Sequence, residues 1–393
     1  MKKLKFLIIT CLSTASLVTV YLLILVQSSG QAAPFGAMVD PIFDDEFNVE
    51  LTGPEMGFVS FDQEFTAQIS INPLEFENHL PIVLNTCFLG TDQILYEDDF
   101  DLFVMNSDGS CLTKLSDPAT AQDWSPSWSP DGTQIAFLTS EGVPCCTPAM
   151  HLMDADGSNE TDTPGFGGQP VWSPDGTKIA FSYRSAQPFP SSSIYFFQLS
   201  GSNSVLLAGE AMEPVWSPDS SKIAFTSFAP NDRKINLMNA DGSNRIELAT
   251  DEAYSPSWSP DGTRIAYLVY NVAEMAYDIY LMQPDGLNQT KLTGHVASAQ
   301  RPAWSPDGLQ IAFTSNMDSN NEVYVIDVDG TGLTNLTNHP ATDNFLNWSP
   351  DGSEILFESS RFTPFQFAIM FADGSSPRGL GVHGNSATWR PSP

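Results

Sequence analysis

Basic side chains are scarce in this sequence, and their scarcity limits the partners that the protein can have. Lys and Arg together number 16 against 47 Asp and Glu, which gives 393 residues a formal net charge of −31. Such a surface repels nucleic acid and anionic membranes, because both carry dense negative charge. A solvated acidic surface is the simplest interpretation, and cationic partners or divalent cations remain compatible with it.

The sequence also lacks the short motifs that mark common catalytic and metal centres. It has no G-x-S-x-G nucleophile elbow, no H-E-x-x-H and no C-x-x-C, and its five histidines are scattered. An α/β-hydrolase centre and a zinc-protease centre are therefore not expected. We therefore predict no catalytic residue from the sequence.

Cysteine is rare as well, with five residues in the whole chain. Apart from Cys11 in the N-terminal apolar run, they are Cys87, Cys111, Cys145 and Cys146. In an oxidising compartment such cysteines form disulfides, and otherwise they are buried thiols. The sequence leaves their connectivity open.

The N-terminus has the composition of an export signal. Three lysines precede an uncharged apolar run over residues 6–26, and a polar stretch then ends in Gln31-Ala32-Ala33-Pro34. Residues 1–33 are interpreted as a signal peptide or a signal anchor, because a run of this length also spans a bilayer of about 30 Å. Either alternative places the rest of the chain outside the cytoplasm, in the periplasm, at the cell surface or secreted, with membrane anchoring by residues 6–26 if the signal is retained.

Residues 34–78 form a separate segment that is acidic, rich in Phe and free of Lys and Arg. The segment is interpreted as a tether, a cap or a partly disordered region. The alternation in "FVSFDQEFTAQISI", residues 58–71, also suggests a strand or two. The repeats described next fill the remaining residues, 79–393.

A Trp-centred unit recurs through the rest of the chain, as in "PAWSPDGLQIAF" at residues 302–313. Its tryptophans are Trp128, Trp172, Trp216, Trp258, Trp304, Trp348 and Trp389, at intervals of 44, 44, 42, 46, 44 and 41 residues. Between them falls a second signature, an apolar strand followed by Asp-Gly and a short strand ending in Leu-Thr or similar residues. Each period therefore predicts four short strands, which is typical of a propeller blade.

The two ends of the repeat region complement each other. Residues 93–116 supply only the second, third and fourth strands of a unit, and residues 386–392 supply only the first. We expect an all-β propeller of four-stranded antiparallel blades, closed by pairing of strands from both ends. Seven blades follow from this count, and six are the alternative if the N-terminal strands lie outside the ring.

The pattern P-x-W-S-P-D-G-x-x-I-A-F, then I-Y-x-M-x-x-D-G and L-T, resembles the TolB-type repeats of WD-repeat-like β-propellers. The resemblance covers residues 90–393 and implies a propeller fold. It does not extend to the α/β domain that precedes the propeller in TolB proteins, because residues 34–78 are too few to form one. The Gly-His…Trp-Asp signature of true WD repeats is missing.

The repeated Ser-Pro-Asp-Gly segment is interpreted as a turn and not as a catalytic site. Pro, Asp and Gly each suit their position in a tight turn, and the Trp supplies a large buried surface. At Trp216 a serine, Ser220, replaces the glycine, which predicts a locally different turn. The turns that keep the glycine contain the aspartates Asp131, Asp175, Asp261, Asp307 and Asp351.

Binding residues are expected on the face where the loops vary in sequence and length. Three residues before each Trp lie Gln169, Glu213, Ser255, Arg301 and Phe345, near the predicted channel entrance, and His295 and His339 each lie nine residues before their Trp. Asp318, Asn320 and Glu322 are a weak Ca²⁺ candidate, since all three carry oxygen ligands. No other cofactor or metal is expected.

The favoured hypothesis is a non-enzymatic binding propeller that is monomeric and engages a protein or a glycan through its loop-rich face. The alternative is a lyase of acidic oligosaccharides with a central metal held by histidines, which the resemblance also allows. The acidic charge makes the protein a poor host for an anionic sugar. A purely structural propeller is a third possibility, since a fold does not fix a function.

Overall fold

The computed structural model describes most of the repeat region and six short strands that precede it. The described residues are 92–391, except 117–120, 141–147, 186–190, 230–231, 250–251, 295–297 and 364, together with strand segments between residues 8 and 71. The chain divides into two compact units, Met1–Thr86 and Cys87–Pro393. Among the described residues no helix is long and apolar enough to cross a bilayer.

The first unit contains two small sheets. Its strands are β1 (Ile8–Thr14), β2 (Leu17–Leu23), β3 (Ala37–Met38), β4 (Asn48–Leu51), β5 (Gly57–Phe61) and β6 (Gln68–Ile71). One sheet has the order β1-β2-β5-β3, and the other pairs β4 with β6. Strands β1 and β2 lie within the apolar run over residues 6–26. The assignment of this run to an export signal stays a prediction.

The second unit is a propeller of seven four-stranded antiparallel sheets, with no helix in its described residues. From the centre outwards, the first strands are β10 (Gln122–Trp128), β14 (Val171–Trp172), β18 (Ala211–Trp216), β22 (Ala253–Trp258), β26 (Gln300–Trp304), β30 (Asp343–Trp348) and β34 (Ser386–Trp389). The second strands are β11 (Gln134–Ser140), β15 (Lys178–Ser185), β19 (Lys222–Ala229), β23 (Ile265–Asn271), β27 (Gln310–Ser315), β31 (Glu354–Ser359) and β7 (Gln93–Asp98). We number the blades 1 to 7 in this order.

The third strands are β12 (Ala149–Asp154), β16 (Ser191–Gln198), β20 (Asp232–Asn239), β24 (Ala276–Met282), β28 (Glu322–Asp327), β32 (Gln366–Phe371) and β8 (Asp101–Asn106). The outer strands are β13 (Thr161–Phe166), β17 (Val205–Gly209), β21 (Ile246–Ala249), β25 (Thr290–Lys291), β29 (Thr334–Asn335), β33 (Arg378–Gly379) and β9 (Thr113–Lys114). Four of the seven outer strands are only two residues long.

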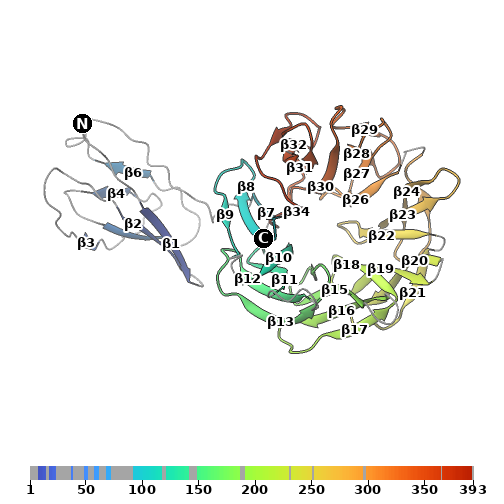
Figure 1. Cartoon of the computed structure of the whole chain (residues 1–393), viewed down its shortest axis with the longest axis horizontal. Coiled ribbons are helices and arrows are strands. Elements are labelled where there is room, and N and C mark those ends of the chain that lie inside the picture. Colours follow the sequence, from blue (N-terminus) through green and yellow to red (C-terminus); the bar gives the residue numbers. More distant parts are fainter. Residues whose placement is uncertain are drawn as a thin grey trace. The chain divides into compact units, whose positions relative to one another are not determined.

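Blade 7 is built from both ends of the repeat region. Strand β34 pairs antiparallel with β7, with Trp389 opposite Ile94 and Ser386 opposite Glu97 (Figure 1). The Arg390 amide and guanidinium also donate to the backbone and side-chain oxygens of Gln93, at 2.7 Å each. The seven-bladed prediction is therefore confirmed, and the six-bladed alternative is wrong.

The repeated tryptophans pack between neighbouring blades. Each lies with the Ile and aromatic residues of its own second strand, which are fully buried. In four blades the indole N–H donates to the carbonyl of the residue that precedes the Trp of the blade before, at 3.0–3.2 Å. A buried indole N–H usually has a hydrogen-bond partner, and in these four blades the bond links one blade to the next.

The Ser-Pro-Asp-Gly segments form closed turns at the face opposite the variable loops. In the turn of the quoted unit, the Gly308 amide donates to the Ser305 carbonyl at 2.9 Å. The Asp307 carboxylate accepts from the Ser305 hydroxyl at 2.6 Å and from the Leu309 amide at 3.0 Å. The same contacts recur around the ring, so each turn aspartate is occupied by its own turn.

Ser220 does not change its turn, so the prediction of a locally different turn is wrong. Its φ is +59°, and its amide donates to Ser217 at 2.8 Å as the glycines do in the other turns. Its hydroxyl accepts the Asp175 amide of the neighbouring blade at 3.0 Å. This extra hydrogen bond offsets the strain of a left-handed serine.

Replacing Ser220 by alanine is therefore expected to lower the free energy of unfolding by about 1 kcal/mol, because the strain stays and the hydrogen bond is lost. Ser220→Gly relieves the strain while losing the same bond, so its stability should stay within about 0.5 kcal/mol of wild type. Urea unfolding of the two variants measures the difference. An alanine variant as stable as wild type would contradict the compensation.

The turn aspartates also predict a dependence of stability on pH. The pKa values of Asp219, Asp261, Asp307 and Asp351 are lowered, first by the hydrogen bond from the serine hydroxyl two residues earlier and then by a backbone amide. A lowered folded-state pKa stabilises the fold above the unfolded value of about 3.9, and that stability is lost as pH falls through the folded value. The urea concentration at the unfolding midpoint should therefore decrease as the pH is lowered from 5 to 3 in citrate buffer.

A variant with Asn at these four positions is the control for the pH prediction. Asparagine can still accept the turn hydrogen bonds but does not titrate, so the fall of the urea midpoint below pH 4 should become shallower. An unchanged acid response in this variant would assign it to other carboxylates.

Candidate functional site

The variable loops gather on one face of the propeller. In an antiparallel blade, the loop from the second to the third strand and the loop from the fourth strand to the next blade leave from the same edge. We call this side the loop-rich face and the side with the Ser-Pro-Asp-Gly turns the turn-rich face. Sequence reasoning placed its candidate residues on the loop-rich face.

A repeated β-bulge shapes the first strands near this face. The pairing with the second strand shifts between the residues four and one before the Trp, as between Met212 and Val215. The residue three before the Trp takes a left-handed conformation there, with φ of +55° at Glu213, +49° at Ser255 and +51° at Arg301. Bulges redirect side chains in this way, and the sequence pattern did not reveal them.

Glu213 connects two blades across the bulge. Its carboxylate accepts the Thr226 hydroxyl at 2.8 Å and the Ser255 amide of the next blade at 3.0 Å. The side chain of Gln169, at the equivalent position, is exposed. Phe345 is fully buried in the core instead of lying at the channel entrance, because the bulge of its strand falls one residue later.

Glu97 plays a similar part in blade 7, and sequence reasoning missed it. Its two carboxylate oxygens accept the Ser125 amide at 3.0 Å and the Asn385 side-chain amide at 2.9 Å. The side chain is almost completely buried. A signal was present, since a glutamate interrupts the apolar second strand "QILYED".

Arg301 is exposed at its bulge and interacts electrostatically with a carboxylate that the sequence did not single out. Burial raises the pKa of Glu358, while a hydrogen bond from Asn344 and the charge of Arg301 lower it. The carboxylate lies near the end of the second strand of blade 6. The carboxylate on which the charge of Arg301 acts is therefore that of Glu358 and not that of Glu213.

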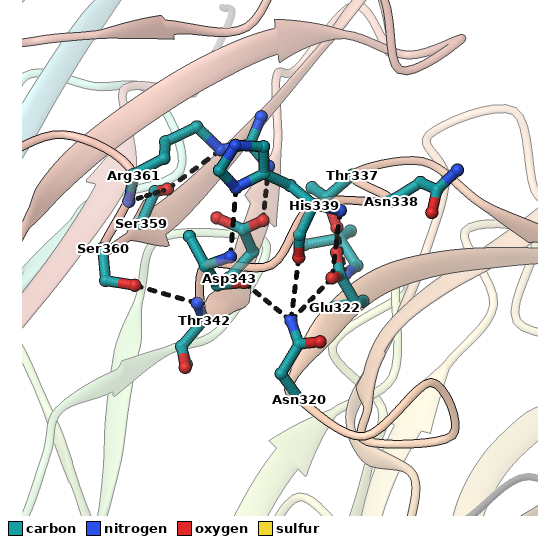
Figure 2. Close-up of polar contacts among 12 residues, drawn as sticks. Asn320, Glu322, Thr337, Asn338, His339, Thr342, Asp343, Ser359, Ser360 and Arg361 are labelled. Carbon is teal, nitrogen blue, oxygen red and sulfur yellow. Dashed lines mark hydrogen bonds and ion pairs between the residues drawn. The ribbon is translucent and has the colours of Figure 1, made fainter.

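His339 belongs to a network of loop contacts between blades 5 and 6, shown in Figure 2. Glu322, which is buried, accepts the Thr337 hydroxyl, the Asn320 side-chain amide at 2.6 Å and the His339 amide at 3.1 Å. The Asn320 amide nitrogen also donates to the carbonyls of His339 and Ala341. Both oxygens of Glu322 therefore hold the loop that carries His339.

The imidazole of His339 is used partly by the same loop. Its Nδ1 accepts the Ala341 amide at 3.0 Å, so the neutral ring carries its proton on Nε2. His295, the predicted counterpart, lies outside the described residues. The pairing of the two histidines stays a prediction.

The three Ca²⁺ candidate residues lie in two separate networks. Asp318 accepts the Tyr324 hydroxyl at 2.6 Å and the Asn335 amide at 2.9 Å, whereas Asn320 turns its nitrogen toward Glu322. Across the described part of the chain no group of three or more His, Cys, Asp or Glu side chains is arranged to hold a metal. These geometries satisfy the carboxylates with protein donors.

Beside this network lies a buried ion pair. The Arg361 guanidinium donates to Asp343, which is fully buried, and also to the Ser359 hydroxyl at 3.1 Å (Figure 2). The Thr342 amide donates to Ser360 at 2.8 Å. The pair joins the start of blade 6 to the loop after its second strand. Its contacts make it part of the scaffold.

The fourth-strand signature Leu-Thr gains an explanation from the same region. The Thr337 hydroxyl accepts the Val323 amide at 3.0 Å, and the Thr293 hydroxyl accepts the Ile279 amide at 2.9 Å. Each hydroxyl replaces a backbone carbonyl where the third and fourth strands separate. The motif therefore extends the sheet by one side-chain bond.

A tyrosine cluster stands at the loop-rich end of blade 4. The ring of Tyr277 meets Tyr254 at 5.6 Å and Tyr270 at 5.0 Å between centroids. The Arg233 guanidinium, from blade 3, lies 4.6 Å above the Tyr254 ring and donates to its hydroxyl. We call these four residues the tyrosine cluster.

A turn with two exposed apolar side chains, and with Glu274 between them, lies next to the tyrosine cluster. It joins β23 to β24 and presents Val272, 73% exposed, and Met275, 78% exposed. Met275 has a φ of +50°, a backbone conformation that residues other than glycine rarely adopt. Val272 and Met275 therefore give this turn a small exposed apolar surface beside the tyrosine cluster.

Cys111 follows the Asp-Gly turn of blade 7 and is disulfide-bonded. Cys87, Cys145 and Cys146 lie outside the described residues. A disulfide agrees with the sequence expectation for an oxidising compartment, and the connectivity stays open.

Comparison with known proteins gives a family and a fold. The model of the TolB beta propeller domain matches residues 93–254 and 230–392. No curated protein matches the chain at a significant level. Solved structures with a similar fold include TolB from Acinetobacter baumannii, at 16% identity and a TM-score of 0.48, covering 82% of this chain and 90% of that one.

Two enzyme propellers are also similar in fold. An oligogalacturonate lyase in complex with manganese has 18% identity and a TM-score of 0.56, over 72% of this chain and 91% of that one. The β-propeller domain of the Trilobed protease from Pyrococcus furiosus has 16% identity and a TM-score of 0.52, over 67% and 84%, and is described as having an open velcro topology. Here β34 and β7 pair and close the ring. Because the family match spans most of the sequence, the chain belongs to the TolB beta propeller domain family.

Proposed function

We propose that this chain is a non-enzymatic, extracytoplasmic binding propeller that engages a protein through the loop-rich end of blade 4. The observation that carries the proposal is the tyrosine cluster together with the exposed Val272 and Met275 beside it. Tyr, Arg and Met are the residue types enriched where proteins bind proteins. A folded scaffold holds them on strand ends, which limits the entropy lost on binding.

Three glutamates of the loop-rich face support a binding role over a catalytic one. Glu97, Glu213 and Glu322 each accept two or more hydrogen bonds from neighbouring loops and blades. A general acid or base has to exchange protons with a substrate, and groups held in this way are already committed to the scaffold. The extracytoplasmic location is supported by the signal-like N-terminus and the disulfide at Cys111.

A capture experiment with matched variants tests the proposal. Immobilised wild-type protein is compared with Val272→Ser/Met275→Ser, and with Leu287→Ser/Leu309→Ser as a control that removes two exposed apolar residues from the turn-rich face. A protein retained by wild type and the control but lost by the blade 4 variant is the expected result. Equal capture by all three proteins, or capture of a glycan on an array instead, would overturn the assignment.

The lyase alternative is tested separately. The purified protein is analysed for bound transition metals and assayed on acidic oligosaccharides with added Mn²⁺. No turnover is the outcome expected for a binding protein. Turnover that depends on the metal would refute the non-enzymatic proposal and identify the protein with the functional class of its lyase neighbour.

A further inference from the structure

The outer strands of the propeller expose their free edges to solvent, and one of them differs from the rest. Four outer strands, β9, β25, β29 and β33, are only two residues long. The three longer ones are β13, β17 and β21. A long free edge invites pairing with another chain, and natural proteins usually protect it with charges, proline, β-bulges or shortness.

All three long edges contain an irregular register, and two of them carry further protection from a charge or a proline. Strand β13 contains Asp162 and Pro164, and β21 contains Glu247. Strand β17 reads Val-Leu-Leu-Ala-Gly, without charge or proline. Val205 is 48% exposed and Leu206 is 55% exposed. The edge of β17 is therefore the least protected among the described outer strands.

The local geometry keeps these two side chains available. Val205 and Leu206 pair in regular register with Phe196 and Tyr195, and the bulge of the strand falls after them. Leu207 packs against Gly242 of blade 3. Its Cδ2 atom lies 3.0 Å from the position that a Cβ atom on Gly242 would occupy. The bulge thus packs the partly buried Leu207 against the core and leaves the two residues before it at the surface.

The sequence around β17 is neutral over an unusual length. No Asp, Glu, Lys, Arg or His occurs in residues 185–209, which include the third strand, β16, and the outer strand, β17, of blade 2. In a chain in which 16% of residues are charged, about four charges are expected in a stretch of this size. We call this stretch the neutral strip.

The charge of the protein indicates which partner fits the neutral strip. A cationic partner gains attraction from the carboxylates that cover the molecule elsewhere, and it gains none here. Two copies of a chain with a net charge of −31 repel each other, so the repulsion is smallest at an edge strand that itself carries no carboxylate. We propose that two copies of this chain associate through β17, edge to edge and antiparallel about a two-fold axis.

Salt dependence gives the first test. Sedimentation velocity of the full chain is recorded in low salt and in 1 M NaCl. Repulsion acts over about 10 Å at 0.1 M salt and about 3 Å at 1 M, so a neutral contact between acidic bodies should tighten as salt rises. Dimer that increases with salt is expected. A monomer at every salt and protein concentration would refute the proposal, and the monomer predicted from sequence would stand.

Variants at Leu206 give the second test. In a contact with two-fold symmetry the same substitution is present on both copies. Leu206→Lys should therefore weaken association by more than about tenfold. Leu206→Thr removes the apolar surface with less risk to folding, and Leu287→Lys is the matched control with the same charge change at an exposed turn. Dimerisation that survives both Leu206 variants, or that Leu287→Lys abolishes equally, would assign the contact to another surface.

Discussion

Alanine in place of Trp389 is expected to lower the free energy of unfolding by about 3–5 kcal/mol. The indole is buried among Ile94, Tyr96 and Met105 of blade 7 and Leu356 of blade 6. The cavity left by the substitution would lie at the seam where the last strand of the ring meets the first. The loss therefore weakens closure as well as packing.

Hydrogen exchange separates these two effects. Amides of β7 and β34 should exchange faster in Trp389→Ala under conditions in which amides of β23 and β24 are unchanged, because the seam opens before the ring unfolds. Trp389→Phe is the control, since it keeps most of the buried surface and should cost less than about 1.5 kcal/mol. Uniform acceleration across all blades would show that the seam has no separate stability.

Removing the positive partner of the buried ion pair should have an effect of similar size. Arg361→Met leaves Asp343 as an uncompensated buried carboxylate, which is expected to cost about 3–5 kcal/mol. The loss should appear as a lower urea midpoint. Because the pair fixes the loop after β31, that loop should also become more susceptible to proteolysis.

The double variant Asp343→Ala/Arg361→Met is the decisive companion. Five residues before their tryptophans, blades 3, 4 and 5 carry Ala211, Ala253 and Ala299, all fully buried, where blade 6 carries Asp343. Alanine therefore suits the backbone at this position, and the double variant should recover most of the stability lost by Arg361→Met. A double variant as unstable as the single one would show that the charge pair itself is not what the site requires.

Much of the fold follows from the sequence because its repeats are strong and local. The alternation around Trp304 and the Pro-Asp-Gly turn each have a cause within a few residues, and recurrence made the blade count firm. The complementary ends predicted the seam between Trp389 and Ile94. These features depend on patterns that a sequence displays directly.

The candidate site was harder to predict from the sequence, because its contacts depend on bulges and on residues far apart in the chain. Spacing from the Trp placed Phe345 with Glu213 and Arg301, but a bulge shifted by one residue turned Phe345 into the core. Glu97 was missed because its partners, at Ser125 and Asn385, come from distant parts of the chain. The tyrosine cluster likewise draws on two blades, and no local pattern indicates which strand ends become neighbours.

The seam between β34 and β7 has a consequence for the time course of synthesis. Arg390 and Gln93, which are bonded across it, are 297 residues apart in the chain. At a synthesis rate of about 5–20 residues per second, the inner edge of β7 waits roughly 15–60 s for its partner strand. During that interval blade 7 has only its three N-terminal strands, and β7 is open to any other strand within reach. A nascent chain of this kind depends on holding one β-sheet edge unpaired until its last strand emerges.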